Sequence, residues 1–290
     1  MKLRVVQGLI DFLRGKKNFY SFCFPIYHFF KHKLGKSVIV LGNSHVNFFG
    51  INEHSADFQE AIHIDNFNVG INFCDRELFK FPKSKLSVFH LDPVLAYSLD
   101  KYNTKSLGRE KVEYMIKNGY INKGSKILCC FGEIDIRSQL FKHLNKENTD
   151  RQTDRQTDRQ TDRQTDRQTD LLLNDGINAI LDNYLKFLLF LKNKGYKVYC
   201  WGVTPSGTFE NAVDFQVFPE IEVNKAKKMF NNKLENICKE YGFGFINIFD
   251  KLINQDYTLK SEYTFDNFHL NNKIWTSAEK ELLKSGIFDK

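Results

Sequence analysis

The chain has 290 residues, of which 42% are hydrophobic and 14% aromatic, enough to bury an apolar core and to exclude a globally disordered protein. Its net charge of +7 comes entirely from residues 1–36, where eight basic residues face one acidic residue. The rest of the chain is neutral, so no basic groove for nucleic acid is expected. We therefore expect residues 37–290 to form one large domain, preceded by a basic, aromatic segment.

Residues 1–36 interleave Lys and Arg with Phe and Tyr, a pattern with two interpretations. One is peripheral contact with an anionic inner membrane, and the other is a helix packed on the domain with a solvated outer face. Charged residues interrupt both apolar runs, so we expect neither a membrane span nor a signal peptide and predict a cytoplasmic protein. The six cysteines show no C-x-x-C spacing, which favours reduced core cysteines over disulfides or a bound metal.

Three apolar runs in the first half of the chain predict β-strands, at 37–42, 85–91 and 126–131. Between the second and third of these strands, residues 108–118 form a helix candidate. All three strands are followed by polar residues. In an open α/β sheet the carboxyl ends of the strands face the ligand crevice, so functional side chains are expected there.

Ser44 follows the first strand in the sequence Gly42-Asn43-Ser44-His45. Its position suits a nucleophile at the crevice, but a serine after a strand is also a common helix cap. A serine hydroxyl attacks weakly until a base removes its proton. The catalytic interpretation therefore requires an oriented histidine elsewhere in the chain.

Residues 149–170 form a polar insertion, in which TDRQ occurs five times and Thr-Asp follows. A four-residue polar period matches no heptad or solenoid, so we expect a solvated segment that is partly helical. Thr, Asp, Arg and Gln can be encoded as ACA GAC AGA CAG, a tetranucleotide repeat whose slippage would shift the reading frame. Such switching resembles phase variation in bacteria, which typically controls enzymes that decorate surface polysaccharide. An ordinary low-complexity linker is the alternative.

The second half of the chain continues the alternation of strands and helices. Apolar spacing predicts helices over 174–194 and 223–241, and strands over 197–203 and 244–248. Alternating elements of this kind predict a three-layer α/β/α domain with a parallel sheet covered on both faces, interrupted by the repeat.

Asp266 and His269 supply the acid and base that Ser44 requires. Their spacing lets the carboxylate meet the imidazole within one turn, which fixes the tautomer and stabilises the imidazolium formed during attack. Taken alone, D-x-x-H is a common and mostly structural pattern. The combination with Ser44 is what predicts a catalytic triad.

Three segments together resemble the sequence blocks of the SGNH (GDSL-like) hydrolase family. Residues 42–45 resemble its G-D-S-H or G-N-S-H block, residues 132–135 (GEID) fall where the family has G-x-N-D, and residues 266–269 resemble its D-x-x-H block. The resemblance implies a flavodoxin-like fold and acyl-ester chemistry through an acyl-serine. It makes Ser44 the nucleophile, His269 the general base and Asp266 the acid that orients it.

The chain departs from the family in the oxyanion hole. The family combines the backbone N–H of the serine, a backbone N–H of the second block and the side chain of the third-block Asn. Ile134 stands in place of that Asn and cannot donate, which can cost about 10²–10³ in rate, although backbone N–H groups near Glu133 could substitute. The second block is represented either by Gly70 or by Asp92.

The G-E-I-D-x-R form resembles a subgroup of SGNH-like proteins found with polysaccharide biosynthesis. Arg137 either clamps an acidic sugar or forms an ion pair with a neighbouring carboxylate. His45 and His90 are interpreted as packing or substrate-contact residues rather than a second base. The candidates for oxyanion or substrate binding are Asn43, Asp92, Glu133, Asp135 and Arg137.

These features predict a serine-dependent carbohydrate O-acyltransferase, most simply one that moves an acetyl group to a bacterial surface polysaccharide or its precursor. Acetyl-CoA is a plausible donor, and no bound cofactor is expected. The alternatives are a carbohydrate esterase or deacetylase of the same fold and a non-catalytic glycan-binding protein. A flavodoxin-like nucleotide binder is disfavoured because the chain has no Gly-rich phosphate loop.

Overall fold

The computed structural model describes residues 36–50, 60–64, 69–77, 84–144, 162–207 and 219–289. The interpretations of the basic N-terminal segment lie outside the described residues, except that Lys36 begins the first strand. Most of the TDRQ repeat lies outside them as well.

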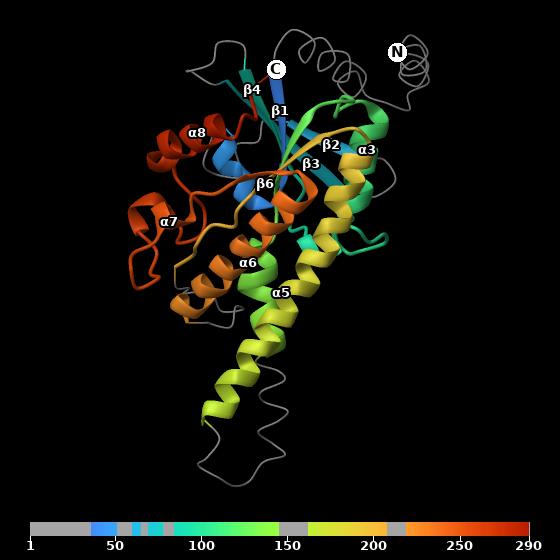
Figure 1. The fold of residues 1–290 in the computed structure, drawn as a ribbon. Coiled ribbons are helices and arrows are strands. Elements are labelled where there is room, and N and C mark those ends of the chain that lie inside the picture. Colours follow the sequence, from blue (N-terminus) through green and yellow to red (C-terminus); the bar gives the residue numbers. More distant parts are fainter. Residues whose placement is uncertain are drawn as a thin grey trace, which may run out of the picture.

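One seven-stranded sheet forms the centre of the described structure, in the order β2-β3-β4-β1-β5-β6-β7 (Figure 1). Neighbours from β4 to β7 pair in parallel, as the sequence predicted, whereas β3 pairs antiparallel with both β2 and β4. The predicted parallel sheet is therefore extended at one edge by two antiparallel strands. The strands are β1 (Lys36–Gly42), β2 (Glu60–Ile64), β3 (Val69–Glu77), β4 (Ser84–His90), β5 (Lys126–Cys130), β6 (Lys197–Trp201) and β7 (Gly244–Ile246).

The alternation of side chains along β1 divides the interior into two cores. Ile39 and Leu41 point into one cluster of buried residues, and Val38 and Val40 point into another on the opposite face. Each face needs its own cover, because successive side chains of a strand point to opposite sides of the sheet. The result is the predicted three-layer α/β/α arrangement.

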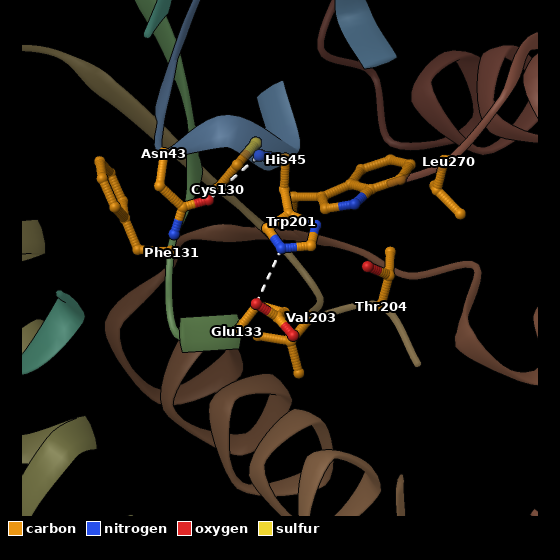
Figure 2. A pocket seen from close by; sticks show the side chains of 9 residues that line it. All are labelled: Asn43, His45, Cys130, Phe131, Glu133, Trp201, Val203, Thr204 and Leu270. Carbon is orange, nitrogen blue, oxygen red and sulfur yellow. Dashed lines mark hydrogen bonds and ion pairs between the residues drawn. The ribbon is translucent and has the colours of Figure 1, made fainter. Parts of the chain in front are cut away.

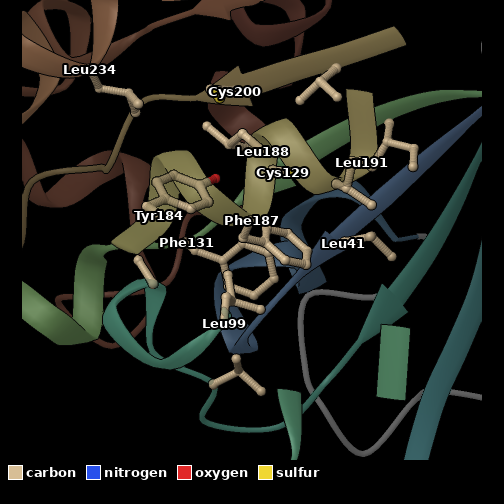
Figure 3. Close-up of a cluster of buried hydrophobic side chains, with 14 of the residues drawn as sticks. Leu41, Leu99, Cys129, Phe131, Tyr184, Phe187, Leu188, Leu191, Cys200 and Leu234 are labelled. Atoms are coloured by element: carbon tan, nitrogen blue, oxygen red, sulfur yellow. The ribbon is translucent and has the colours of Figure 1, made fainter. Parts of the chain in front are cut away.

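The first core is covered by three helices, α3 (Gly108–Asn118), α5 (Asp162–Asn193) and α6 (Glu220–Tyr241). Figure 3 shows aromatic and aliphatic side chains of α5 packed against the strands. The second core is covered by shorter elements, which are η1 (Ser44–Phe49), α7 (Phe249–Leu252) and α8 (Trp275–Lys284).

Helix α5 begins at Asp162, twelve residues before the predicted start at 174. The end of the repeat is therefore helical, and its first turns extend away from the sheet in Figure 1. A helix already nucleated by packing gains one hydrogen bond for each residue added, and Arg and Gln are good helix formers. The remaining helical segments are η3 (Ala96–Ser98), η4 (Asp135–Leu140), η5 (Ser261–Tyr263) and η6 (Asn272–Ile274).

Four of the cysteines are buried in the cores with free thiols, as expected for core residues: Cys129, Cys130, Cys200 and Cys238. None of the described helices has a segment long and apolar enough to cross a bilayer. Within the same part of the chain, no group of three or more His, Cys, Asp or Glu residues is arranged to hold a metal ion.

Candidate active site

Ser44 lies at the first position of η1, directly after β1. Asn43 caps this 3-10 helix, because its Oδ1 accepts a hydrogen bond of 3.2 Å from the backbone N–H of His45. Gly42 is required before the turn, since a Cβ there would lie 2.5 Å from the carbonyl oxygen of Cys130. The turn is thus held against the sheet, with Ser44 at the carboxyl edge that the sequence predicted.

His269 and Asp266 lie next to Ser44. His269 Nε2 is 2.9 Å from Ser44 Oγ, and His269 Nδ1 is 2.5 Å from Asp266 Oδ2. The other oxygen of Asp266 accepts hydrogen bonds from the backbone N–H groups of Phe268 and His269, at 3.0 and 2.7 Å. The three residues therefore form the connected arrangement in which a carboxylate orients an imidazole toward a hydroxyl.

The turn that carries the acid and base is held from two sides. Asn267 adopts a left-handed conformation with φ of 66°, and its carbonyl oxygen accepts a hydrogen bond of 2.8 Å from the backbone N–H of Gly207. The ring of Phe265 stacks on the imidazole of His269, with centroids 5.6 Å apart and planes inclined by 15°. Asn is among the few residues that tolerate this backbone conformation.

The electrostatics of the pair favour an ionised acid. Burial raises the pKa of Asp266, but the hydrogen bonds that its carboxylate accepts from His269 outweigh this effect, so the pKa falls to about 2. Asp266 is therefore a carboxylate throughout the neutral range. A carboxylate at this position keeps the Nδ1 proton on His269 and leaves Nε2 free to accept a proton from Ser44.

Glu133 lies in a buried charged cluster beside the triad. Its Oε2 is 2.8 Å from His45 Nε2, and its Oε1 accepts hydrogen bonds from Arg137 Nε at 2.7 Å and Lys227 Nζ at 2.8 Å. The Glu133 side chain is only 4% exposed and that of Lys227 is fully buried. Lys227 also donates a hydrogen bond of 2.7 Å to Ser206 Oγ.

Both members of the buried pair are charged at neutral pH. Burial alone would raise the pKa of Glu133, but the positive charges of Lys227, His45 and Arg137 lower it well below its usual range. Burial lowers the pKa of Lys227 to about 8, and the charge of Glu133 partly opposes that effect. Burial also lowers the pKa of His45, and the charge of Glu133 opposes that effect. Since a carboxylate can only accept, His45 donates its Nε2 proton to Glu133.

Asp135 is held by backbone groups. Its side chain is buried, and its two oxygens accept hydrogen bonds of 2.9 Å from the backbone N–H groups of Ala96 and Tyr97. Both oxygens thus hold the start of η3, at the end of the loop that follows β4, and substrate binding by Asp135 stays a prediction. The same loop contains Asp92, one of the two candidates for the second block.

Asp92 is the better of those two candidates. It follows the carboxyl end of β4, where His90 is the register partner of Gly42, and its φ is 63°. Its carboxylate accepts a hydrogen bond of 2.8 Å from Lys111 Nζ, so only its backbone is free to act in an oxyanion hole. Gly70 pairs with His63 inside the antiparallel edge, which excludes it from the end of a parallel strand.

The remaining candidates are accounted for by structural contacts. Arg137 pairs with Glu133 and lies 4.7 Å over the ring of Phe268, so the predicted ion pair is present, while the sugar clamp stays a prediction. Ile134 precedes η4 and has no side-chain donor, as the sequence indicated. His90 is buried, and its burial lowers its pKa, although the charge of Asp92 opposes this.

A cavity of about 20 Å³, room for about one water molecule, lies under the turn that carries Ser44 (Figure 2). Asn43 and His45, the neighbours of Ser44 in the chain, line it, as does Leu270, the neighbour of His269. Glu133 forms part of its polar wall. The other lining residues are Cys130, Phe131, Trp201, Val203 and Thr204.

Sequence reasoning missed the two buried lysines, Lys227 and Lys111. Both lie on apolar stripes of helices, since Val223, Lys227 and Phe230 share the buried face of α6. Lys111 is likewise buried on α3 and donates to the Leu91 carbonyl oxygen at 2.7 Å. A lysine inside a 3.6-residue apolar stripe is the signal that could have identified them, because buried lysines require a charged or polar partner.

No protein-family model matches the chain, and no curated protein is significantly similar to it in sequence. Among solved structures, it is similar to a Bacteroides fragilis protein assigned as an acylhydrolase, with 12% identity, 89% of this chain and 93% of that chain covered, and a TM-score of 0.48. It is also similar to a GDSL-like lipase from Bacteroides thetaiotaomicron, with 13% identity, 90% of this chain and 95% of that chain covered, and a TM-score of 0.45. A third similar structure is a catalytic mutant of an acetylxylan esterase from Geobacillus stearothermophilus, with 8% identity, 87% of this chain and 94% of that chain covered, and a TM-score of 0.46.

Proposed function

We propose that this chain is a serine-dependent carbohydrate O-acyltransferase that works through an acyl-serine, with acetyl as the transferred group. The observation that carries the proposal is the continuous contact from Asp266 through His269 to Ser44, at 2.5 and 2.9 Å. Such an arrangement converts a weak hydroxyl into a nucleophile. The order of the three sequence blocks, which resemble those of SGNH hydrolases, supports the same chemistry.

In the first half-reaction, Ser44 Oγ attacks the carbonyl carbon of the acyl donor while its proton passes to His269 Nε2. The bond between the carbonyl carbon and the leaving group then breaks, and the leaving group takes the proton from His269. The products are an ester on Ser44 and the free alcohol or thiol of the donor. Asp266 stabilises the imidazolium between these steps.

In the second half-reaction, a sugar hydroxyl attacks the acyl-serine and gives its proton to His269. The new ester forms on the sugar, and the proton returns to Ser44 Oγ. If water takes the place of the sugar, the same intermediate is hydrolysed and the enzyme is an esterase. Transfer requires that the acceptor be positioned and water excluded.

Two features of the sequence favour transfer to a surface polysaccharide over hydrolysis. The TDRQ repeat is compatible with a tetranucleotide tract that would switch expression on and off, and residues 1–36 are basic and aromatic, which suits a membrane surface. Acetyl-CoA is the donor we propose. A non-catalytic glycan-binding protein is the second candidate, favoured by Ile134 at the position of the third-block Asn.

The chemistry is tested by following the release of p-nitrophenol from p-nitrophenyl acetate and of CoA from acetyl-CoA, for the wild type and Ser44→Ala. We expect Ser44→Ala to lose the wild-type rate by at least about 10³-fold, because the nucleophile is removed. Equal rates would eliminate the serine mechanism. The matched control is Ser98→Ala on η3, whose hydroxyl donates only to the carbonyl oxygen of Leu95.

Transfer is separated from hydrolysis by mass spectrometry of surface glycan from cells with the repeat in frame and out of frame. An additional acetyl group on the in-frame glycan supports the transferase, and a missing one supports the deacetylase. Identical glycan from the two cell populations, together with no Ser44-dependent turnover, would favour the binding protein. Codons that vary along the repeat would contradict the switching hypothesis.

A further inference from the structure

We infer that Glu133 is a positioning residue, which ties the turn bearing Ser44 to the turn bearing Asp266 and His269. The inference rests on the proposed function, since it concerns the geometry of the same triad. Glu133 makes no hydrogen bond or ion pair with Ser44, Asp266 or His269 in the described structure. It reaches both turns through three sets of contacts, each formed by a different partner.

The first connection runs to the nucleophile. Glu133 Oε2 holds the imidazole of His45 at 2.8 Å, and His45 is the residue after Ser44. The backbone N–H of His45 is in turn held by Asn43, the residue before Ser44. The ring of His45 also lies 5.0 Å from that of His269, so a shift of His45 would move both sides of the Ser44 to His269 contact.

The second connection runs through Arg137 to the catalytic base. Arg137 Nε donates to Glu133 Oε1 at 2.7 Å, and the guanidinium lies 4.7 Å over the ring of Phe268, which precedes His269. Phe268 is buried, so its ring has a fixed position against this cation. A cation over an aromatic face is attracted to it, and the carboxylate of Glu133 holds the guanidinium in that place.

The third connection runs through Lys227 to the turn between acid and base. Lys227 Nζ bridges Glu133 Oε1 and Ser206 Oγ, at 2.8 and 2.7 Å. Asn224 fixes the backbone of Ser206 with two hydrogen bonds of 3.0 Å. Gly207, the next residue, donates its backbone N–H to Asn267, which lies between Asp266 and His269.

These connections explain why a charged cluster is buried beside the cavity. A buried carboxylate that accepts charge-assisted hydrogen bonds from Arg and Lys fixes direction as well as distance, which packed apolar side chains do less well. Because a misplacement of about 1 Å in a catalytic group can cost about 10²-fold in rate, a device that holds two distant turns in register acts directly on turnover. A merely structural ion pair would act on stability alone.

The test compares Glu133→Gln, Glu133→Asp and the paired variant Glu133→Gln/Lys227→Met with the wild type, using p-nitrophenyl acetate. The paired variant removes both charges, so no buried charge is left without its partner. We expect kcat to fall about 10- to 100-fold in all three variants, while KM changes less than about 3-fold. Glu133→Asp is included because it keeps the charge but has a side chain too short to reach the same partners. The control is Glu113→Gln, which breaks another i,i+4 pair, with Arg109 on α3, and should leave kcat unchanged.

Crystal structures of the same variants give a readout that does not depend on activity. We expect the Ser44 Oγ to His269 Nε2 distance to exceed hydrogen-bonding range in Glu133→Gln and in the paired variant, while both cores stay intact. If the paired variant turns over within 2-fold of the wild type, or if the contact survives unchanged in its crystal structure, the positioning role is wrong. Failure of the proposed function is seen separately, as wild-type turnover that survives in Ser44→Ala.

Discussion

His269 Nε2 lies 2.9 Å from Ser44 Oγ, although 225 residues separate the two in the chain. The contact exists because β1 ends at the centre of the sheet and the turn after η5 folds back over that end. Neither residue is positioned by its own sequence neighbourhood alone. The geometry of the pair is therefore a property of the whole domain, and changes to the groups that support it should appear in turnover.

Asp266→Asn should lower kcat by about 10³–10⁴-fold, because an amide can present its N–H to Nδ1 and so favour the wrong tautomer of His269. Hydrolysis of p-nitrophenyl acetate measures the loss, and circular dichroism verifies that the variant is folded. The control is Asp256→Asn, an exposed aspartate that accepts from the backbone N–H of Thr258 in a similar turn. A loss below about 10-fold in Asp266→Asn would remove the acid from the mechanism.

The pair of Lys111 and Asp92 should respond unequally to the loss of either partner. Lys111 is buried, whereas the Asp92 side chain is 39% exposed. Asp92→Asn leaves a buried ammonium without its counter-charge and should cost about 2–3 kcal/mol of unfolding free energy. Lys111→Met leaves a carboxylate that water can solvate and should cost about 1 kcal/mol. Asn tolerates the left-handed backbone at position 92, so strain does not confuse the comparison.

Urea denaturation of the two variants measures this difference. Equal losses, or a larger loss for Lys111→Met, would mean that the packing of the lysine stem outweighs its charge. Turnover of Asp92→Asn should remain close to that of the wild type, because only the backbone of Asp92 is available to an oxyanion.

The five parallel strands could be predicted from the sequence to within two residues because their side chains pack into both cores. Their apolar runs are continuous, and polar residues mark both ends. The antiparallel edge could not be predicted, since the sequences of β2 (EAIHI) and β3 (VGINFCDRE) mix polar and apolar residues without a clear period. Edge strands of this kind are specified by pairing with a neighbour rather than by their own pattern.

The Ser44, Asp266 and His269 constellation could be predicted because its motifs are local, whereas the groups around it could not be assigned. The sequence offers Glu133 and Arg137 as candidates for substrate contact, but at i,i+4 spacing the two side chains form an ion pair with each other. Lys227 enters the cluster from α6, 94 residues away in sequence from Glu133. Such a contact depends on how α6 crosses the sheet, which periodicity within the helix does not determine.

The raised pKa of Asp135 predicts that replacing this residue changes how the free energy of unfolding depends on pH. Burial raises the pKa of Asp135 to about 6, above its value near 3.8 in the unfolded chain. Between these values the folded state binds more protons than the unfolded state, so this group stabilises the fold below pH 4 and loses that contribution as the pH rises through 6. Asp135→Asn removes the titration.

The difference in unfolding free energy between wild type and Asp135→Asn should therefore shift by about 2 kcal/mol in favour of the variant between pH 4 and pH 6. Urea denaturation at several pH values measures it, and contributions from other groups cancel in the difference. A constant difference across this range would show that Asp135 has an ordinary pKa in the folded protein.

Gly132, which precedes Glu133, should tolerate no side chain. Its φ is 109°, and a Cβ would lie 2.7 Å from the ring of the buried Phe230. Gly132→Ala should cost about 3 kcal/mol of unfolding free energy, since backbone strain and overpacking add. Gly124 also has positive φ, at 80°, but has open space around it, so Gly124→Ala should cost only about 1 kcal/mol. Thermal unfolding of both variants separates the two contributions, and equal losses would mean that Phe230 yields to the new methyl group at no cost.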